Sequence, residues 1–399
     1  MALSSDPGVT HVLPANTNHL ELDRLIMNPE VKVIVCCGSG GVGKTTTAAA
    51  MALRAAEAGR KVCVMTIDPA KRLAQSMGLT ELDNTPRAVQ GIGNLNGGSL
   101  DAMMLDMKRT FDEIVVAHAE PERAQAILEN PFYQALSSSF AGTQEYMAME
   151  KLGQLRTEAG QTGVWDLIIV DTPPSRSALD FLDAPKRLGS FLDGRMMRLL
   201  AAPAKGGGRI AGKIVGAGLG FATGALNKIV GAQVLTDLQT FMASFDTLFG
   251  GFRHRAEQTY AQLQAPDTRF IVVAAPEPDA LREAAYFVER LGDEDMPLAG
   301  LVLNRVTVVP LADLTAEAAI AAADRLAEST EDDHEHQLTE DLLRLHADNI
   351  NTARRQSQVA KRFHAAHPLV AIGIVPTQSE DIHDLAGLRL VGNLLATEI

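Results

Sequence analysis

The sequence contains little cysteine, few aromatic residues and no long uncharged apolar segment. Its 399 residues include one tryptophan and three cysteines, Cys36, Cys37 and Cys63. An odd number of cysteines without a CxxC pair excludes a disulfide framework and a zinc ribbon. No apolar run reaches the roughly 18 residues of a membrane-spanning helix, and the N-terminus lacks the order of a signal peptide. These absences predict a cytoplasmic protein.

Charge is unevenly distributed along the chain. The 36 Lys and Arg residues against 49 Asp and Glu give a net charge of −13, which argues against bulk nucleic-acid binding. The window 186–228 nevertheless holds one acid and eight basic residues, a local charge of +7 (Lys186, Arg187, Arg195, Arg198, Lys205, Arg209, Lys213, Lys228 and the acid Asp193). Residues 311–350 hold eleven acids against Arg325 and Arg344, which predicts a solvated helix–loop–helix surface.

Short apolar runs rich in β-branched residues alternate with helical patterns. Such runs fit strands that are buried on both faces, as in a parallel sheet. We therefore predict an α/β fold with a doubly wound, mostly parallel sheet and an inserted helical subdomain. The expected strands are 31–37, 61–67, 165–170, 269–275, 298–303 and 369–375. Residues 100–160 and 176–265 have helical periodicity, and we expect no strand in them.

A glycine-rich turn follows the first expected strand. Residues 38–45 match the P-loop pattern GxxxxGK[ST] in full, between a strand and a helix, which is the context that confirms the motif. Backbone N–H groups and the helix N-terminus would hold phosphate oxygens, Lys44 would reach the β/γ phosphates, and Thr45 would offer its hydroxyl to Mg²⁺. We expect this cradle to consist of Gly38, Ser39, Gly40, Gly41, Val42, Gly43, Lys44, Thr45 and Thr46.

Two aspartates end later strands, where ligands bind in open α/β sheets. Asp171 closes an apolar strand, and after a P-loop such a carboxylate is expected in the Mg²⁺ shell. Asp68 ends the second strand. It is a candidate to orient the attacking water and to assist the metal, or else it caps the helix over 71–77.

Together these residues resemble the ATPase family of arsenite-pump subunits and tail-anchored-protein targeting factors, in the SIMIBI class of P-loop proteins. The similarity is strongest to the actinobacterial branch of anion-transporting-ATPase-like proteins. It implies that residues 68–70 and 171–182 are the nucleotide-sensing switches I and II. It also implies that Asn304, Arg305 and Pro376 form the adenine pocket, so that ATP and Mg²⁺ are the cofactors.

This reading divides the chain into a nucleotide-binding domain and helical additions. The domain comprises 31–99, 161–182, which contains switch II, and 266–399. The additions are an N-terminal arm (1–30), a helical insertion (100–160), a glycine-rich basic helical subdomain (183–265) and the acidic helical insertion within 311–350.

The sequence departs from the family pattern at Ser39. The family usually has a lysine there, which reaches the phosphates of a dimer partner, and a hydroxyl cannot supply that charge. Either another cation replaces it (Lys71, Arg72 or Arg176) or a different subunit donates it, and turnover is then slow or partner-dependent. The three cysteines lie on expected core strands, which predicts neither an arsenite thiolate site nor the zinc clip of the targeting factors.

The expected activity is ATP hydrolysis to ADP and phosphate by a homodimer, or by a heterodimer with a paralogue. The nucleotide state would control an apolar helical surface for a hydrophobic client or a peripheral membrane contact. The open alternatives are the energising subunit of an anion transporter and a low-turnover nucleotide-binding subunit. For the basic subdomain, the sequence is equally consistent with helices that merely pack on each other or on a partner subunit.

Overall fold

The computed structural model describes residues 12–14, 16–67, 72–79, 81–93, 96–130, 133–134, 137, 143–173, 254, 257–311, 313–328 and 334–397. Two compact units divide the chain, one made of 1–104, 158–178 and 263–399, the other of 105–157 and 179–262. Among the described helices, none is long and apolar enough to cross a membrane.

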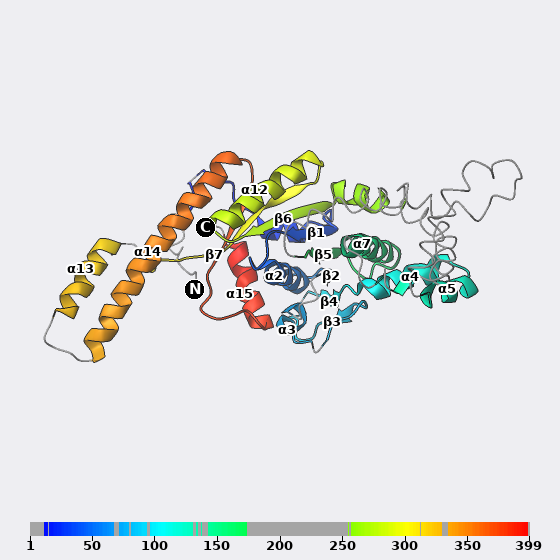
Figure 1. The fold of residues 1–399 in the computed structure, drawn as a ribbon, viewed down its shortest axis with the longest axis horizontal. Helices are drawn as coiled ribbons and strands as arrows, with labels where there is room; N and C mark the ends of the chain where they lie inside the picture. The colour runs from blue at the N-terminus through cyan, green and yellow to red at the C-terminus, as the bar shows by residue number, and fades with distance from the viewer. Residues whose placement is uncertain are drawn as a thin grey trace, which may run out of the picture. The chain divides into compact units, whose positions relative to one another are not determined.

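The first unit is built on an eight-stranded sheet in the order β3-β4-β2-β5-β1-β6-β7-β8 (Figure 1). All neighbouring strands are parallel except β3 and β4. The strands are β1 (Val33–Cys37), β2 (Lys61–Thr66), β3 (Arg87–Ala88), β4 (Ser99–Met104), β5 (Leu167–Asp171), β6 (Thr268–Ala274), β7 (Leu298–Val306) and β8 (Ile372–Pro376). The α/β fold with a mostly parallel sheet is therefore confirmed.

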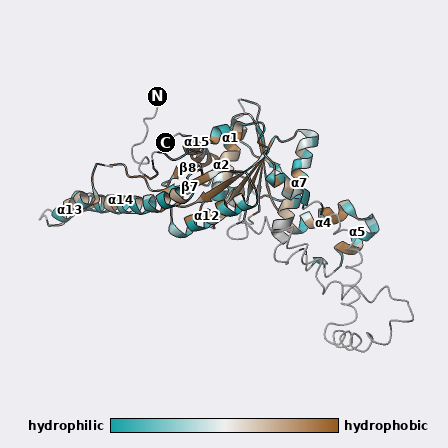
Figure 2. Ribbon diagram, turned by 90° about the horizontal axis from the view of Figure 1, so that it is seen from above, coloured by the Kyte–Doolittle hydropathy of each residue, from teal (hydrophilic) through white to brown (hydrophobic). Residues whose placement is uncertain are grey.

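The sheet is covered by helices on both faces because the chain runs outward from β1 in two directions. The helix α2 (Lys44–Glu57) connects β1 to β2, and α12 (Pro278–Asp293) connects β6 to β7 on the other side of β1. Right-handed crossovers in opposite directions place their helices on opposite faces. The shorter helix α1 (Leu22–Met27) and α15 (Leu385–Ala396) pack against α2 (Figure 2), and α3 (Arg72–Ser76) follows β2.

The region between β7 and β8 is a helical hairpin. Its helices are α13 (Ala316–Ala327) and α14 (His334–Ala366), which pack against each other, and α14 also contacts α12. This α13–α14 hairpin extends away from the sheet (Figure 1). Residues 311–350, for which we expect a helix–loop–helix, contain α13 and the first half of α14, and α14 continues to Ala366.

The second unit contains α4 (Met107–His118), α5 (Pro121–Leu128) and most of α7 (Thr143–Thr162). Asp106 caps α4 by accepting a hydrogen bond from the backbone N–H of Arg109 at 2.9 Å. The Tyr133 hydroxyl donates to Asp112 at 2.6 Å and its ring meets Phe111 edge to face. These contacts tie the segment after α5 back to α4.

The expectation of helices without strands over 100–160 is wrong at its beginning. Residues 99–104 form β4, which pairs with β2 in parallel register. Asp101 interrupts the apolar run in this strand and hides it from a reading by hydrophobicity. Its carboxylate has a structural role, because it accepts a hydrogen bond from the indole N–H of Trp165 at 2.7 Å.

The described part of the N-terminal arm packs against the sheet. Residues 18–20 extend along the edge strand β8, where the Leu20 N–H donates to the carbonyl of Ile372 and the Ile372 N–H donates to that of Asn18. These bonds cover the beginning of this edge strand.

Arg60, immediately before β2, anchors the end of the N-terminal arm. Its guanidinium is buried and donates to the carbonyls of Ile26, Asn28, Val31 and Asp166, and to the Asp166 carboxylate at 2.8 Å. A buried guanidinium with every bond in use is stabilising only while all its partners remain.

Candidate functional site: the P-loop and its supporting strands

The loop between β1 and α2 folds back over the carboxyl end of the sheet because three of its glycines have positive φ. Gly38 (φ 147°), Gly41 (φ 76°) and Gly43 (φ 93°) adopt conformations that side chains disfavour. A Cβ at Gly38 would lie 2.1 Å from the carbonyl oxygen of Val273 on β6. The loop can therefore approach the next strand closely only with glycine at this position.

Lys44 begins α2 and is buried at 6% exposure. Its ammonium group donates to the carbonyl oxygen of Ser39 at 2.7 Å, across the P-loop. A lysine ammonium group beside the backbone of a glycine-rich loop at a helix N-terminus is the arrangement that binds the phosphates of a nucleotide. The hydroxyl oxygen of Ser39 is buried and has no hydrogen-bond partner within the described part of the chain.

Thr45 and Asp171 meet at the start of α2. The Thr45 hydroxyl donates to Oδ2 of Asp171 at 2.7 Å, and the Thr66 hydroxyl at the end of β2 donates to the same oxygen at 2.9 Å. The parallel register sets Asp171 between Cys36 of β1 and Thr66 of β2, and the carboxylate is fully buried. The predicted pair of metal-ligating side chains is thus brought together.

The donor set fits Mg²⁺. A hydroxyl and a carboxylate are hard oxygen ligands, which Mg²⁺ takes in preference to nitrogen or sulfur. Neighbouring oxygens around an octahedral Mg²⁺ at about 2.1 Å are about 3 Å apart, close to the 2.7 Å that separates Thr45 Oγ1 from Asp171 Oδ2.

Asn304 on β7 contacts the P-loop directly. Its side-chain amide donates to the carbonyl oxygen of Val42 at 2.8 Å, and a Cβ at Gly43 would lie 2.1 Å from that amide nitrogen. Arg305 next to it has φ 63° at a shift in the register between β7 and β8, and Pro376 ends β8 beside it. The structure therefore places Asn304 against the P-loop, while Arg305 and Pro376 lie at the adjoining ends of β7 and β8.

The cysteines are core residues, as predicted. Cys36, Cys37 and Cys63 are 4% exposed or less. Burial, and secondly the charge of Asp171, raises the pKa of Cys36 well above its ordinary value, and burial raises the pKa of Cys37 to about 12. Both thiols therefore remain protonated at neutral pH and are poor ligands for soft metal ions.

Several predicted site residues lie outside the described residues. They are Asp68 and the rest of switch I, switch II beyond Pro173, Lys71, Arg176 and the basic window 186–228. The side chain of Arg72 is likewise not described.

The sequence did not indicate Thr66 as a site residue, and it indicated Thr172 only as part of switch II. Thr66 holds the Asp171 carboxylate, and the Thr172 hydroxyl donates to the carbonyl of Cys36 at 2.9 Å, fixing the strand end next to β1. The available signal was a hydroxyl at the end of an otherwise apolar strand. Only the parallel register reveals what each hydroxyl faces.

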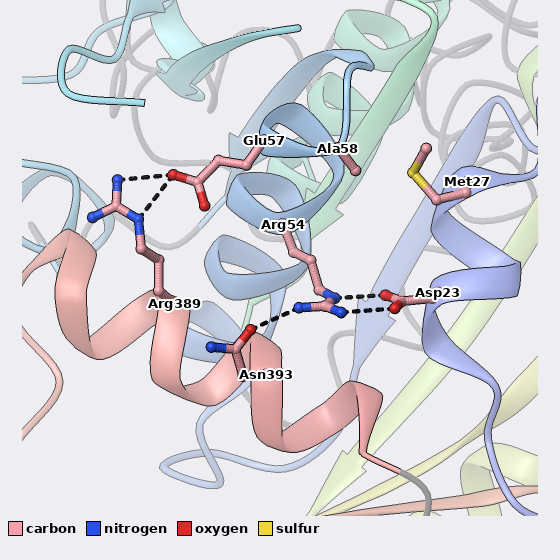
Figure 3. A pocket seen from close by; sticks show the side chains of 7 residues that line it. All are labelled: Asp23, Met27, Arg54, Glu57, Ala58, Arg389 and Asn393. Atoms are coloured by element: carbon pink, nitrogen blue, oxygen red, sulfur yellow. Dashed lines mark hydrogen bonds and ion pairs between the residues drawn. The ribbon is translucent and has the colours of Figure 1, made fainter. Parts of the chain in front are cut away.

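A polar pocket of about 350 Å³ lies at the end of α2 that is remote from the P-loop (Figure 3). Arg54 donates to Asp23 at 2.7 Å and to Asn393 at 2.8 Å, and Arg389 pairs with Glu57 at 2.8 Å. Because each arginine already faces a carboxylate, the pocket offers no unbalanced charge to a ligand. These contacts instead tie α1 and α15 to α2.

The fold and the loop after β1 define a P-loop nucleotide-binding protein. Comparison with known proteins narrows this class. The model of the anion-transporting ATPase family matches residues 31–315. An ATPase ARSA2 of Chlamydomonas reinhardtii is 28% identical over 297 residues, covering 71% of this chain and 70% of that protein.

Other relatives agree with this match. An ATPase GET3 of Zygosaccharomyces rouxii is 26% identical over 301 residues, 71% of this chain and 75% of its own. A putative arsenical pump-driving ATPase of Halobacterium salinarum is 31% identical over 195 residues, 46% of this chain and 28% of its own. The chain belongs to the anion-transporting ATPase family and is an ATPase.

Proposed function

We propose that the P-loop, Asp171 and Asn304 form an Mg·ATP hydrolysis site. The observation that carries this proposal is the 2.7 Å contact between the Thr45 hydroxyl and the Asp171 carboxylate beside the phosphate cradle. Lys44 exchanges the Ser39 carbonyl for phosphate oxygens, which are stronger partners for an ammonium group. Thr45 and Asp171 hold Mg²⁺, which when bound neutralises charge that develops on the phosphates.

Asn304, Arg305 and Pro376 flank the adenine in this proposal. An amide that donates to the P-loop through its nitrogen retains its oxygen as an acceptor for the exocyclic amine of adenine. Asp68 orients the attacking water, an assignment that rests on its position in the sequence at the end of β2. Hydrolysis then requires no covalent intermediate, only positioning and charge stabilisation.

Steady-state hydrolysis by the purified chain tests these roles. We expect Lys44→Ala to weaken ATP binding and hydrolysis together. Asp68→Asn should leave nucleotide affinity within about twofold and lower turnover at least about tenfold, because loss of a positioned base costs about 10²–10⁴ in rate. Asp279→Asn, an exposed substitution on α12, is the control. Equal turnover in the wild type and Asp68→Asn would remove Asp68 from the mechanism.

We further propose that the chain works as a dimer, with itself or with a paralogue, whose nucleotide state controls an apolar helical surface for a hydrophobic client. Support comes from the family and from the apolar, glycine-rich sequence of 183–265 immediately after switch II. Sedimentation velocity with Mg²⁺ and a non-hydrolysable ATP analogue, with a fluorescent apolar 20-residue helical peptide as client, tests it. A monomer in every nucleotide state, with or without a paralogue, would refute the dimer.

The alternative is the energising subunit of an anion transporter. The family description and the name of the halobacterial relative favour it. The raised pKa values of Cys36 and Cys37 argue against a metalloid held by thiolates. Stimulation of hydrolysis by arsenite or antimonite would support this alternative, whereas stimulation by the apolar peptide alone would support client handling.

A further inference from the structure

The first half of α14 has one face buried against α13. On this inner face Ala347 and Ile350 form an apolar cluster with Ala316 and Ala319, and Leu343 packs against it. Ion pairs across the hairpin reinforce the packing, from Arg344 to Asp324 at 3.0 Å and from Arg354 to Glu317 at 3.3 Å. The two helices are therefore fixed relative to each other without any contribution from the opposite face.

The opposite face of α14 carries three exposed leucines. Leu338, Leu342 and Leu345 are spaced by four and three residues, which places them in one row along the helix. They are 53%, 56% and 56% exposed. We call this row the outer leucine stripe. Single exposed leucines are ordinary, but a continuous row on a helix that already has a buried face indicates an interaction surface.

Negative charge borders the outer leucine stripe. Asp341 and Asp348 each follow a leucine of the stripe by three residues, so both lie beside it, and both are exposed. Arg344 provides little compensation because it already pairs with Glu340 at 2.9 Å and with Asp324. The surroundings are acidic as well, since residues 311–350 carry eleven acids and two arginines.

We propose that the outer leucine stripe is the docking surface for a cationic amphipathic helix of another protein. The leucines match an apolar face, and the carboxylates match lysines or arginines on its border. A second copy of this hairpin is disfavoured because pairing two stripes would bring Asp341 and Asp348 against their own counterparts. An anionic membrane surface is disfavoured by the same repulsion.

Two synthetic peptides test the proposal with the full-length chain. Both are 18-residue helices with the same leucine face, and their polar positions are lysine in one and glutamate in the other. We expect fluorescence anisotropy to detect binding of the lysine peptide, with an affinity that falls as ionic strength rises, and no binding of the glutamate peptide. Equal binding of both peptides would overturn the charge argument.

Variants locate the binding. Leu342→Gln with Leu345→Gln preserves helix propensity and leaves the inner face unchanged. This variant should bind the lysine peptide at least about tenfold more weakly. Asp341→Asn with Asp348→Asn should lower the affinity for the lysine peptide several-fold and make that affinity less dependent on salt.

Matched controls remove the same groups elsewhere. Leu369→Gln with Leu390→Gln changes two other exposed leucines, and Glu289→Gln with Asp293→Asn removes two acids of α12. Neither pair should alter peptide affinity, and circular dichroism confirms folding of every variant. Unchanged affinity in both stripe variants would refute the proposal. So would self-association of the wild type that Leu342→Gln with Leu345→Gln abolishes, because a second copy would then be the occupant.

Discussion

Replacing Asn304 by alanine separates the contact with the P-loop from any contact with the base. In the structure the amide donates to the Val42 carbonyl at 2.8 Å. A hydrogen bond of this kind contributes about 0.5–1.5 kcal/mol net, which corresponds to about two- to tenfold in a dissociation constant. If this hydrogen bond shapes the phosphate cradle, Asn304→Ala should weaken the binding of tripolyphosphate, which has no base, by that factor.

Isothermal titration calorimetry with tripolyphosphate and with ATP measures the two contributions. In Asn304→Ala, the affinity for ATP should fall at least as much as the affinity for tripolyphosphate. Any additional loss for ATP measures the contact of Asn304 with adenine. Asn393→Ala is the matched control, because that amide accepts from Arg54 at the other end of α2. Unchanged affinity for tripolyphosphate in Asn304→Ala would refute the reasoning that this side chain supports the P-loop.

Three further substitutions test the supporting contacts. Thr66→Val removes a hydrogen bond to the Asp171 carboxylate, so the Mg²⁺ concentration for half-maximal hydrolysis should rise about tenfold; an unchanged Mg²⁺ titration would contradict this. Arg60→Lys keeps the charge but offers three donors in place of five, so the free energy of unfolding measured by urea denaturation should fall by about 2–4 kcal/mol. A loss below about 0.5 kcal/mol would be inconsistent with the hydrogen bonds assigned to the Arg60 guanidinium. The Arg54 guanidinium lowers the pKa of Asp23 below its ordinary 3.8, so the stabilisation is present above that pH and lost as the pH falls through the folded-state value. Relative to Asp23→Asn, the wild type should be more stable at pH 7 by less than about 1 kcal/mol, because the carboxylate is half exposed. This advantage should decline as the pH falls below 3.8 and vanish below the lowered folded-state pKa, and an advantage that grows in acid would contradict the assignment.

The sequence predicted the sheet and the P-loop because their signals are local. Buried parallel strands are continuous apolar runs, and the glycines of 38–43 are required by the backbone of the loop itself. Asp171 could be placed because parallel strands end at one edge of the sheet. The choice of Asn304 rested on family resemblance, since nothing local distinguishes it from another asparagine at a strand end.

The features that the sequence did not predict depend on contacts between segments that are distant in the chain. The strand over 99–104 was missed because Asp101 interrupts its apolar pattern, and the reason for that aspartate is a bond to Trp165. Thr66 gains its role only from the register that sets β2 beside β5. The packing of residues 18–20 on β8 likewise follows from backbone hydrogen bonds, which side-chain patterns do not report.

The central claim is that Thr45 and Asp171 hold the metal of an ATP-hydrolysing site. Single-turnover hydrolysis of ATP in Mg²⁺, measured on the wild type, Asp171→Asn and the exposed control Asp279→Asn, tests it most directly. The account predicts hydrolysis by the wild type and the control, and a rate at least about 10²-fold lower in Asp171→Asn, with nucleotide still bound through the P-loop. Wild-type hydrolysis that persists unchanged in Asp171→Asn would contradict it.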